Sequence, residues 1–517
     1  MHGTLLSLAT YPELPGNVVS SLWITGYLVP LAIFIAFFIH ASSIPIVPGI
    51  RGPLLCGRYS LGIHLKQAFI RGRMAQLYVS LHRTYGTTAQ LAPGKVSTNT
   101  IEALADIYGG RRRSAGSAAT GAFFGRSNLY KAVFRKSIGT TTDPEYHAAA
   151  RKLFAPSFRP SRLKKHEGVI KDCIRSLHGL IMRRMDQGDT VVLNELYFSL
   201  SVDMVSGVLL GKSLGCLDRG RPLQWTKQLP RAFYWGTIFY LFKGSGIPRV
   251  LKWMLGSLFL RGRRLNLEKA MTGLIYEQTR AAQDGCYGTM TEVLEHAYSS
   301  PFSEAEIAWN FTAILSAGFH TVCHALCTII WLVFTHPDTH ANLVAELQGT
   351  FNTKDDITLD IAQTLPWLNA VITEALRISP PIPTGPPRVS PGAYVHGVYI
   401  PAGVEVSTSL FALHHNPEYF AEPFSFRPQR WITPNPTDKR EAVQPFLIGS
   451  ESCIAKHFAE QMLQLALASF FLEFNGDYVG RVKDWVADGR SYVFWELPDL
   501  EVRLRERARK AEEMTPL

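Results

Sequence analysis

The sequence predicts a mainly α-helical body with a few small β-sheets, preceded by a single N-terminal transmembrane helix. Two long stretches with helical patterning, residues 303–335 and about 454–474, carry the first expectation. Strand-like residues at 394–406 indicate small sheets. An uncharged apolar run near the start is long enough for a helix that crosses a membrane. The strands do not alternate with the helices, so a dinucleotide-binding domain is not indicated.

The apolar run extends from Val18 to Ile39 and contains 22 residues without a charge. At about 1.5 Å per residue it is roughly 33 Å long, enough to cross a hydrocarbon core of about 30 Å. A cleavable signal peptide is the alternative, because small residues follow the run. The run is longer than the apolar part of a typical signal peptide, and no basic residue precedes it. We therefore expect an uncleaved transmembrane anchor at 18–41 after a short luminal tail at 1–17.

Basic residues occur only after this run. The first of them are Arg51, Arg58, Lys66, Arg71 and Arg73. The positive-inside rule therefore places the body of the protein in the cytosol. The proline- and glycine-rich segment 42–57 cannot continue the helix and predicts a hinge. One large domain, residues 58–517, is expected to follow it.

Helix boundaries in the body are marked by local signals. Ser303 with Glu306 makes a capping box, and the helix that it starts ends at His336-Pro337. Another helix is expected over 366–378, because two prolines follow it. Further signals mark the elements after it: Pro401-Ala402-Gly403 as a hairpin turn, and Asn475-Gly476 as the end of the last long helix.

Composition excludes several classes of protein. The chain has 517 residues, of which 46% are hydrophobic and 18% are charged, so it is not disordered. Its 53 basic and 42 acidic residues give a net charge of +11, which favours an acidic partner or a membrane surface. The stretch 225–264 is rich in aromatic residues and ends in several arginines. Contact with a membrane, an entrance for an apolar substrate and ordinary core packing all remain open for it.

Cys453 is the centre of the functional interpretation. It follows Phe446 and Gly449 in the stretch PFLIGSESCIAKHFA, and a predicted helix begins directly after it. A lone cysteine is more often a small buried apolar residue. A thiolate at a helix N-terminus is stabilised by the helix dipole and by unpaired N–H groups, which lower its pKa. A thiolate held in this way is a good axial ligand for haem iron.

Four motifs in sequence order resemble those of the cytochrome P450 family of haem-thiolate monooxygenases, and of its fungal microsomal branch in particular. The cysteine loop of that family reads F-x-x-G-x-R-x-C-x-G, which Phe446, Gly449 and Cys453 match. The other matches are Glu374-Ala375-Leu376-Arg377 for E-x-x-R, Phe426-Arg427-Pro428-Gln429-Arg430-Trp431 for F-x-P-E-R-W, and Ala317-Gly318-Phe319-His320-Thr321 for A-G-x-D/E-T. The resemblance covers essentially residues 45–505. It implies a cytochrome P450 fold and a haem-thiolate catalytic domain at 58–517, with haem b bound through the thiolate of Cys453.

The resemblance also implies a structural triad of Glu374, Arg377 and Arg430 that locks the cysteine loop. Buried charges are tolerated when they are paired, so the three side chains would form ion pairs. A surface pair of Glu374 with Arg377 is the alternative. Gln429 replaces the glutamate of the family motif, so a carboxylate is lost there.

Further residues are expected around the haem by the same resemblance. The two propionates would be bound by His147, Arg151 and Arg388, for which exposed surface bases are the alternative. Phe446, Gly449 and Ala455 would contribute to the cofactor site beside Cys453. Apolar pocket residues are expected at Phe311, Ile314, Ala317 and the segment 382–384, which indicates a hydrophobic substrate and nothing more specific.

On the long central helix, Ala317 and Gly318 would leave room for oxygen and substrate. Thr321 would bond a backbone carbonyl, distort the helix locally and hold a water for proton delivery. The alternative is an ordinary helical threonine that faces a neighbouring element.

Three positions depart from the family pattern. Glu451 stands where the family has arginine, and an acid there would repel a propionate unless it faces outward. Ala455 replaces a glycine and adds one methyl group. His320 replaces the acid before Thr321. A histidine titrates near neutrality and could relay protons, or it could be a plain packing change with water as the relay.

By resemblance, the chain is a monooxygenase that inserts one oxygen atom from O₂ into an apolar organic substrate, as a tailoring step of secondary metabolism. Electrons would come from an NADPH-dependent flavoprotein reductase, docked on a basic face with Arg151, Lys152 and Lys456. The protein would lie in the endoplasmic reticulum membrane as a single-pass protein with its catalytic domain in the cytosol. The haem propionates, the reductase and the membrane surface would account for the positive charge, so no nucleic-acid partner is expected. One alternative is a haem-thiolate desaturase, ring-forming or rearranging enzyme. Another is a haem-deficient, non-catalytic membrane-bound relative.

Overall fold

The computed structural model describes residues 47–53, 63–109, 123–130, 136–227, 234–238, 240, 273, 288–297, 300–433 and 436–507. The predicted luminal tail and transmembrane anchor lie outside the described residues, as do most of the hinge and most of the aromatic stretch 225–264. The structure therefore bears on the large domain.

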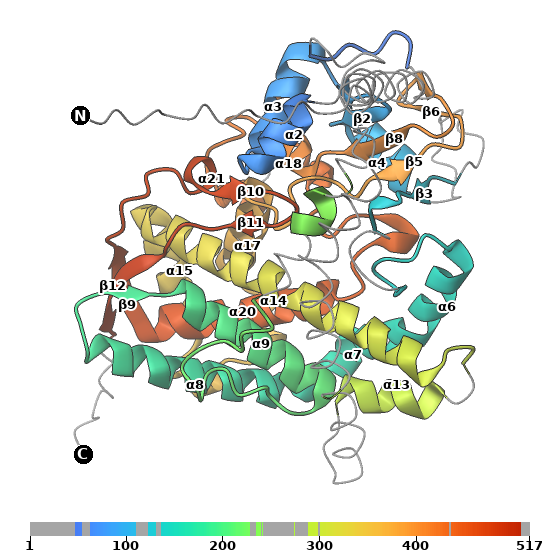
Figure 1. The fold of residues 1–517 in the computed structure, drawn as a ribbon. Helices are drawn as coiled ribbons and strands as arrows, with labels where there is room; N and C mark the ends of the chain where they lie inside the picture. Colours follow the sequence, from blue (N-terminus) through green and yellow to red (C-terminus); the bar gives the residue numbers. More distant parts are fainter. Residues whose placement is uncertain are drawn as a thin grey trace, which may run out of the picture.

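Helices make up most of this domain (Figure 1). They are α2 (Ile63–Ile70), α3 (Met74–Tyr85), α4 (Ile101–Tyr108), α6 (Pro144–Phe154), α7 (Pro160–Leu163), α8 (Glu167–Met185), α9 (Asn194–Leu210), α13 (Thr289–Ala297), α14 (Glu304–Phe334), α15 (Pro337–Thr350), α16 (Leu359–Ala362), α17 (Pro366–Ile378), α18 (Leu410–His414), α19 (Gln429–Ile432), α20 (Lys456–Glu473) and α21 (Trp485–Asp488). The long helices predicted from the sequence correspond to α14, α17 and α20.

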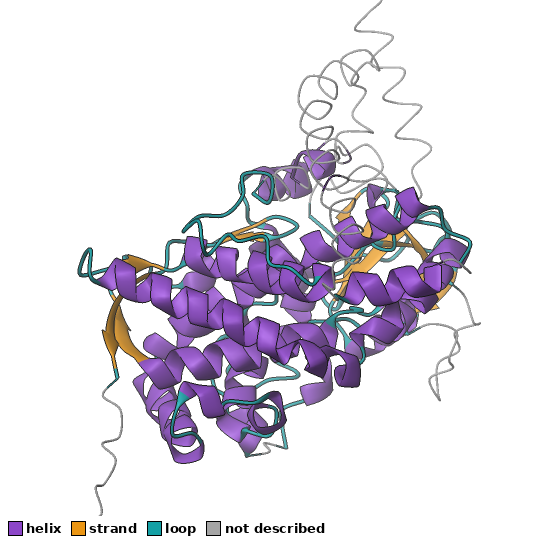
Figure 2. Cartoon of the chain, turned by 90° about the horizontal axis from the view of Figure 1, so that it is seen from below, coloured by secondary structure: helices purple, strands orange, loops and turns teal. Residues whose placement is uncertain are grey.

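The strands of the described residues form four small sheets. The largest has the order β1 (Thr88–Ala92), β2 (Lys95–Thr98), β8 (Glu405–Thr408), β5 (Arg388–Val389) and β3 (Gly125–Arg126), and the others are β4 (Val191–Val192) with β12 (Glu501–Glu506) and β9 (Phe474–Tyr478), β6 (Ala393–Val395) with β7 (Val398–Ile400), and β10 (Arg490–Ser491) with β11 (Trp495–Glu496). Among the described strands, β2 and β8 are the one pair that runs parallel. Figure 2 shows the strands at separate sides of a helical body, which confirms the mainly α fold class.

Helix α14 runs through the middle of the domain and packs against α9, α17 and α20 (Figure 1). It begins at the predicted capping box. The amide of Glu306 donates to Ser303 Oγ at 3.3 Å, and the Ser303 amide donates to the Glu306 carboxylate at 3.0 Å. Among the described residues, α14 is the one helix long and apolar enough to cross a membrane. Since 72% of its apolar window is buried inside the domain, α14 is a core helix.

One turn assignment made from the sequence is wrong. The hairpin turn between β6 and β7 is formed by His396 and Gly397, with φ of 45° and 76°. Such a tight hairpin turn needs positive φ at both central positions, which proline does not adopt. Pro401–Gly403 instead connects β7 to β8, which pairs with β2 and β5. Helix α20 ends close to the expected position, but Asn475 and Gly476 belong to strand β9.

A buried asparagine ties helix α6 to α14. Asn310 is fully buried; its Oδ1 accepts from the amide of Ile138 at 2.5 Å, and its Nδ2 donates to the Tyr146 hydroxyl at 3.0 Å. Phe154 at the end of α6 packs edge-on against Phe311 of α14, with ring centroids 5.0 Å apart. These contacts fix α6 against the core helix, so the side chains that α6 carries into the site are well placed.

Candidate active site

The loop before helix α20 closes on itself at Cys453. The Cys453 amide donates to the carbonyl oxygen of Phe446 at 2.8 Å, and a short 3₁₀ helix, Gly449–Glu451, lies between them. Helix α20 begins at Lys456, with Ala455 at its N-cap. The thiol is free and the residue keeps an exposed surface. The loop therefore presents Cys453 just before a helix N-terminus, as the sequence indicates.

The pKa of the Cys453 thiol is raised, contrary to the expectation from the helix terminus. Desolvation of the thiol by the surrounding protein raises this pKa. The effect outweighs the hydrogen bond from the Ala455 amide and the charge of Arg151, which both lower the pKa. The contacts of the loop therefore do not by themselves lower the pKa of this thiol. A cation bound at Sγ is the strongest means of stabilising a thiolate.

Gly449 is required by the backbone of the loop. Its φ is +80°, and a Cβ placed on it would lie 1.9 Å from the carbonyl oxygen of Tyr108 in helix α4. Only glycine combines this conformation with so close an approach. The cysteine loop is thus seated directly on the end of α4.

We expect Gly449→Ala to lower the free energy of unfolding by at least about 2 kcal/mol, because the methyl group adds strain at positive φ to a clash with backbone. Thermal unfolding of the purified protein measures it. Gly168→Ala in α8 is the matched control, since nothing lies within 4 Å of a Cβ there, and alanine should be neutral or mildly stabilising. Equal stability of the two variants would contradict the assigned backbone strain.

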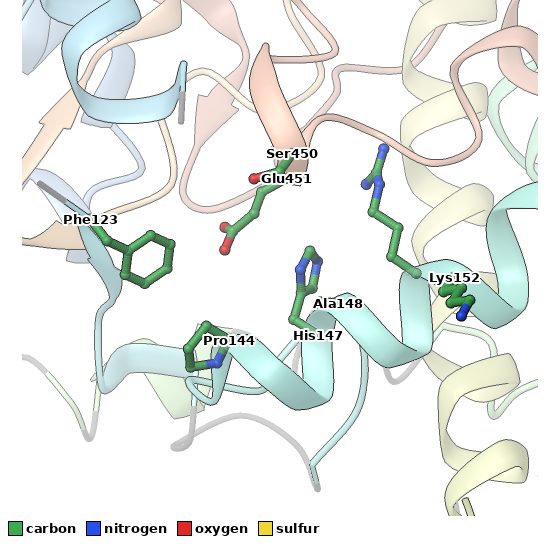
Figure 3. Close-up of a pocket in the computed structure, with 8 residues that line it drawn as sticks. Phe123, Pro144, His147, Ala148, Lys152, Ser450 and Glu451 are labelled. Atoms are coloured by element: carbon green, nitrogen blue, oxygen red, sulfur yellow. The ribbon is translucent and has the colours of Figure 1, made fainter. Parts of the chain in front are cut away.

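Helix α6 places two of the predicted cofactor-binding residues beside the loop. Figure 3 shows His147 and the Glu451 carboxylate pointing toward one another across a pocket, which has a volume of about 370 Å³. One turn further along α6, Arg151 Nη1 donates to the carbonyl oxygen of Ser452 at 2.7 Å and its Nη2 donates to Ser452 Oγ at 3.3 Å. Arg151 therefore braces the backbone next to Cys453.

Two adjacent strands bring two more arginines to the same place. Arg126 of β3 and Arg388 of β5 are directly paired across the sheet. Both donate to Glu451 Oε2, Arg126 through Nε at 3.0 Å and Arg388 through Nη2. The structure thus places His147, Arg151 and Arg388 around one pocket and adds Arg126, which lies in no motif and which sequence reasoning missed.

Charge in this cluster is set by burial and by the arginines. Burial and, after it, the nearby Arg126 charge together lower the pKa of His147 to about 4, so the imidazole is neutral. Burial would raise the pKa of Glu451, but Arg388 and Arg126 outweigh it and hold that pKa below its usual range. Glu451 is therefore an ionised carboxylate that faces inward, not outward.

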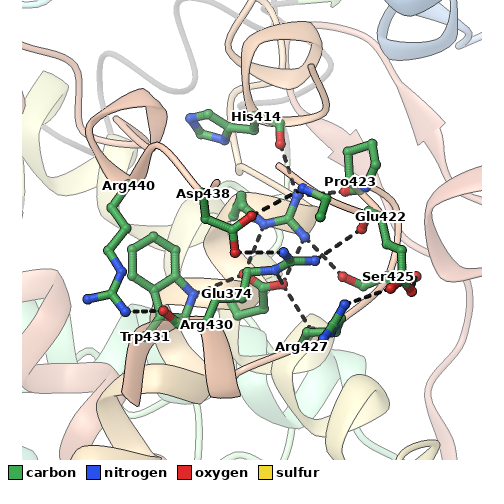
Figure 4. A network of polar contacts seen from close by, with 12 residues as sticks. Glu374, His414, Glu422, Pro423, Ser425, Arg427, Arg430, Trp431, Asp438 and Arg440 are labelled. Carbon is green, nitrogen blue, oxygen red and sulfur yellow. Dashed lines mark hydrogen bonds and ion pairs between the residues drawn. The ribbon is translucent and has the colours of Figure 1, made fainter. Parts of the chain in front are cut away.

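Glu374 is the centre of a buried polar network (Figure 4). Its carboxylate accepts from Arg377 at 2.8 and 2.9 Å, from Arg430 Nε at 3.0 Å and from Trp431 Nε1 at 2.9 Å. Side chains of Glu374 and Arg377 have no exposed surface, so the alternative of a surface pair is excluded. Asp438 Oδ2 accepts from Arg430 Nη1 at 3.0 Å, so the buried cluster holds two acids and two bases. Asp438 was missed from the sequence; Gln429, the replaced motif residue, is exposed.

His414 connects this network to the cysteine loop. Arg377 Nη1 donates to the His414 carbonyl oxygen at 2.9 Å, and His414 Nε2 accepts from the amide of Gln444 at 3.0 Å. Gln444 lies two residues before Phe446, where the loop closes. Burial lowers the pKa of His414 to about 3, so its ring stays neutral and able to accept. The position of the loop thus depends on the Glu374 cluster through His414.

On α14, Ala317 and Thr321 lie one turn apart. Ala317 is exposed, and Thr321 Oγ1 donates to the Ala317 carbonyl oxygen at 2.8 Å. This bond is the one expected from the sequence. Gly318 serves a different purpose from the one expected, because a Cβ there would lie 2.9 Å from the side chain of Val205 in α9. Gly318 lets two core helices approach closely; Ala317 borders the open side.

The surroundings of His320 oppose titration near neutrality and favour the packing alternative. Burial lowers its pKa to about 4. Its ring packs against Phe198 of α9, with centroids 4.7 Å apart, and lines a cavity of about 480 Å³ together with Lys227 and Phe494. The packing interpretation fits this geometry better than a proton relay through an imidazolium.

The predicted apolar pocket residues do not all line one cavity in the structure. Phe311 and Ile314 are buried in the core. Thr384 instead lines a cavity of about 90 Å³ with Tyr78 and Leu129. Substrate-facing positions are therefore better sought around Thr384 and Ala317 than at Phe311.

A model of the cytochrome P450 family matches residues 54–497, which is most of the chain, so the chain belongs to the cytochrome P450 family. Cytochrome P450 monooxygenase BOT4 of Botryotinia fuckeliana is 29% identical over 456 residues, which cover 87% of this chain and 85% of that protein. Cytochrome P450 monooxygenase astD of Aspergillus oryzae is 28% identical over 487 residues, 92% of this chain and 93% of that protein. Cytochrome P450 monooxygenase ORF9 of Penicillium roqueforti is 26% identical, with 92% and 91% covered.

The chain is accordingly an oxidoreductase of the monooxygenase type, and its cofactor is haem b with a cysteine thiolate as axial ligand. The residues present fit this group. A free cysteine lies in a loop that only glycine can form at Gly449, and arginines suited to two carboxylates surround it. Among them, Arg388 Nη1 is a buried donor without an acceptor in the part of the chain that the structure describes. A haem propionate would supply one.

Proposed function

We propose that this protein binds haem b through Cys453 and inserts one oxygen atom from O₂ into an apolar small molecule, as a tailoring step of fungal secondary metabolism. The observation that carries the proposal is the loop of Cys453, closed on Phe446 and surrounded by Arg126, Arg151 and Arg388. Similarity to monooxygenases of Botryotinia, Aspergillus and Penicillium supports the fungal setting.

The chain's own residues have distinct tasks in this proposal. Haem supplies the capacity to activate oxygen once it is bound. Cys453 would hold the haem, while the three arginines would orient the two haem propionates. Ala317 presents only a methyl group on the open side of α14, which leaves room for substrate. Thr321 Oγ1 donates to the Ala317 carbonyl, so its lone pairs remain able to accept from a water that carries a proton.

Membrane attachment and the electron donor also belong to the proposal. The uncharged run of Val18 to Ile39, followed by basic residues, supports a single-pass anchor in the endoplasmic reticulum with the catalytic domain in the cytosol. An NADPH-dependent flavoprotein reductase would supply electrons. Lys152 and Lys456 are exposed near the cysteine loop and suit an acidic partner, whereas Arg151 is already bonded to Ser452.

A desaturase, ring-forming or rearranging enzyme is the main alternative. His320 and Glu451 motivated it from the sequence. In the structure His320 packs among aromatic rings and Glu451 is ion-paired, so neither residue favours it. A haem-deficient relative is opposed by Arg388 Nη1, a buried donor that finds no acceptor among the described residues.

The carbon monoxide difference spectrum of the reduced protein tests the cofactor, and turnover tests the reaction. We expect a thiolate-type band, and, with reductase, NADPH and ¹⁸O₂, one labelled oxygen in the product of an apolar substrate. A band without label in any product would reject the oxygen insertion and favour the alternative reaction class. Absence of the band would reject the proposed function altogether.

A further inference from the structure

Glu451 occupies the position where the family's cysteine loop has an arginine, and it joins two arginines from different strands. A single carboxylate oxygen, Oε2, accepts from Arg126 Nε at 3.0 Å and from Arg388 Nη2. The three side chains are nearly buried, with exposed fractions of 12% for Glu451, 10% for Arg126 and 4% for Arg388. The contact is therefore part of the interior of the site.

Without Glu451 this arrangement would be unfavourable. Arg126 and Arg388 are cross-strand partners in β3 and β5, and like charges directly opposite one another destabilise a sheet. Nearly buried charges also cost several kcal/mol when no opposite charge compensates them. The carboxylate of Glu451 lies between the two guanidinium groups and offsets both effects. It also restricts their orientation, because both donors converge on one oxygen.

The total charge of the cluster matches the group that it would bind. Arg126, Arg151 and Arg388 carry three positive charges, Glu451 carries one negative charge, and His147 is neutral. Two positive charges remain on these buried or partly buried side chains, as many as the two propionates of haem carry negative charges; Lys152 lines the same pocket but is exposed. An arginine in place of Glu451 would leave four. Arg388 Nη1 stays a buried donor without an acceptor among the described residues, so Glu451 does not consume all of the binding capacity of Arg388.

We propose that Glu451 is a positioning residue for the cofactor: it holds Arg126 and Arg388 in place for the haem propionates and sets the charge of their binding site to match two carboxylates. The inference rests on the proposed haem-dependent function. It opposes the simple electrostatic view, in which an acid at this position repels the propionates and weakens haem binding.

The two views predict opposite signs. In the holoenzyme, Glu451→Gln leaves two nearly buried arginines without their shared anion, so we expect haem to be lost about 10-fold faster, the effect of removing a charged hydrogen bond. Glu451→Arg, the family's residue, adds a further cation to the cluster and should also lose haem faster than the wild type. If the acid merely repels the propionates, both variants would lose haem more slowly.

Haem loss is measured by its transfer from the purified ferric protein to an excess of a haem-free acceptor protein. Glu460→Gln is the matched control, because Glu460 is an acid near the cysteine loop whose ion pairs among the described residues are with Lys456 and His457, not with either arginine. The resonance Raman bands of propionate bending provide a second measurement. They should shift in Glu451→Gln and not in Glu460→Gln, whereas a merely structural role would leave them unchanged.

Slower or unchanged haem loss in both Glu451 variants would overturn the proposal, as would unchanged propionate bands in Glu451→Gln. A wild-type protein that binds no haem would overturn it together with the proposed function. A wild type that holds haem but forms no oxygenated product, with faster haem loss in the variants, would reject the proposed reaction and support the role of Glu451.

Discussion

Replacing Cys453 with alanine is expected to abolish the thiolate-type carbon monoxide band and to lower turnover by more than about 100-fold. Changes to the outer contacts of a metal ligand already cost about 10- to 100-fold, and this change removes the proposed ligand itself. The loop should keep its shape, because the bond that closes it joins the backbone amide of Cys453 to the Phe446 carbonyl and does not involve the thiol. Thermal unfolding of the variant should therefore remain cooperative while the band is absent.

Cys323→Ala is the matched control for this experiment. Cys323 lies on α14, and its Sγ is 3.7 Å from the Asn194 carbonyl oxygen. It therefore belongs to the contacts of α14 and not to the cysteine loop. We expect its band and turnover to match those of the wild type. A thiolate-type band that survives in Cys453→Ala but disappears in Cys323→Ala would show that Cys323 is the ligand and that its assignment to Cys453 is wrong.

The sequence predicts residues whose role depends on the chemistry of their own side chain or on neighbours that are close in sequence. Cys453 is recognised because few residues ligate haem iron and because a loop glycine and a helix start accompany it. Ser303 and Glu306 define the start of α14 within one turn, since capping depends on residues that are near in sequence. Glu374 and Arg377 share one helix, so their pairing needs no knowledge of the rest of the fold.

Residues that act through long-range contacts could not be predicted. Arg126 and Glu451 are 325 positions apart; the pairing of β3 with β5 places Arg126 beside Arg388, and the cysteine loop brings Glu451 to both. His414 reaches the cysteine loop through its ring and the triad through its carbonyl oxygen. The direction of a side chain on α14 is a similar case. Helical periodicity places His320 on a face, but only packing with Phe198 shows that its ring is buried there.

The sign of a charge effect also depends on the assembled structure. Glu451 was expected to oppose an anionic cofactor, since a single acid near a carboxylate repels it. Two arginines bonded to that acid reverse the argument, because removing the acid exposes their mutual repulsion. Gln429 is the opposite case. Gln429, which replaces the motif carboxylate, is exposed, so the lost carboxylate would not have joined the buried cluster. Asp438 provides the second acid of that cluster.

Glu374→Gln should be the most destabilising single change in the described domain that leaves the haem ligands intact. It leaves Arg377 and Arg430 buried with only Asp438 to balance them, and one of the two carboxylate oxygens becomes an amide group facing arginine donors. Breaking a buried ion pair from one side costs about 3–5 kcal/mol. We expect a comparable loss in the free energy of unfolding and a smaller fraction of protein with haem, measured by thermal unfolding and by the carbon monoxide band.

Asp477→Asn is the control that separates this cluster from ordinary surface ion pairs. Asp477 and Arg505 lie 3.0 Å apart with about 60% of each side chain exposed, and such pairs contribute at most about 1 kcal/mol. Comparable losses in the two variants would contradict the central role of Glu374. The link through His414 adds a sharper requirement. If Arg377 positions the cysteine loop through that residue, His414→Ala should reduce haem content as Glu374→Gln does, and the double variant should lose less than the sum of the two, because both changes break the same chain of contacts.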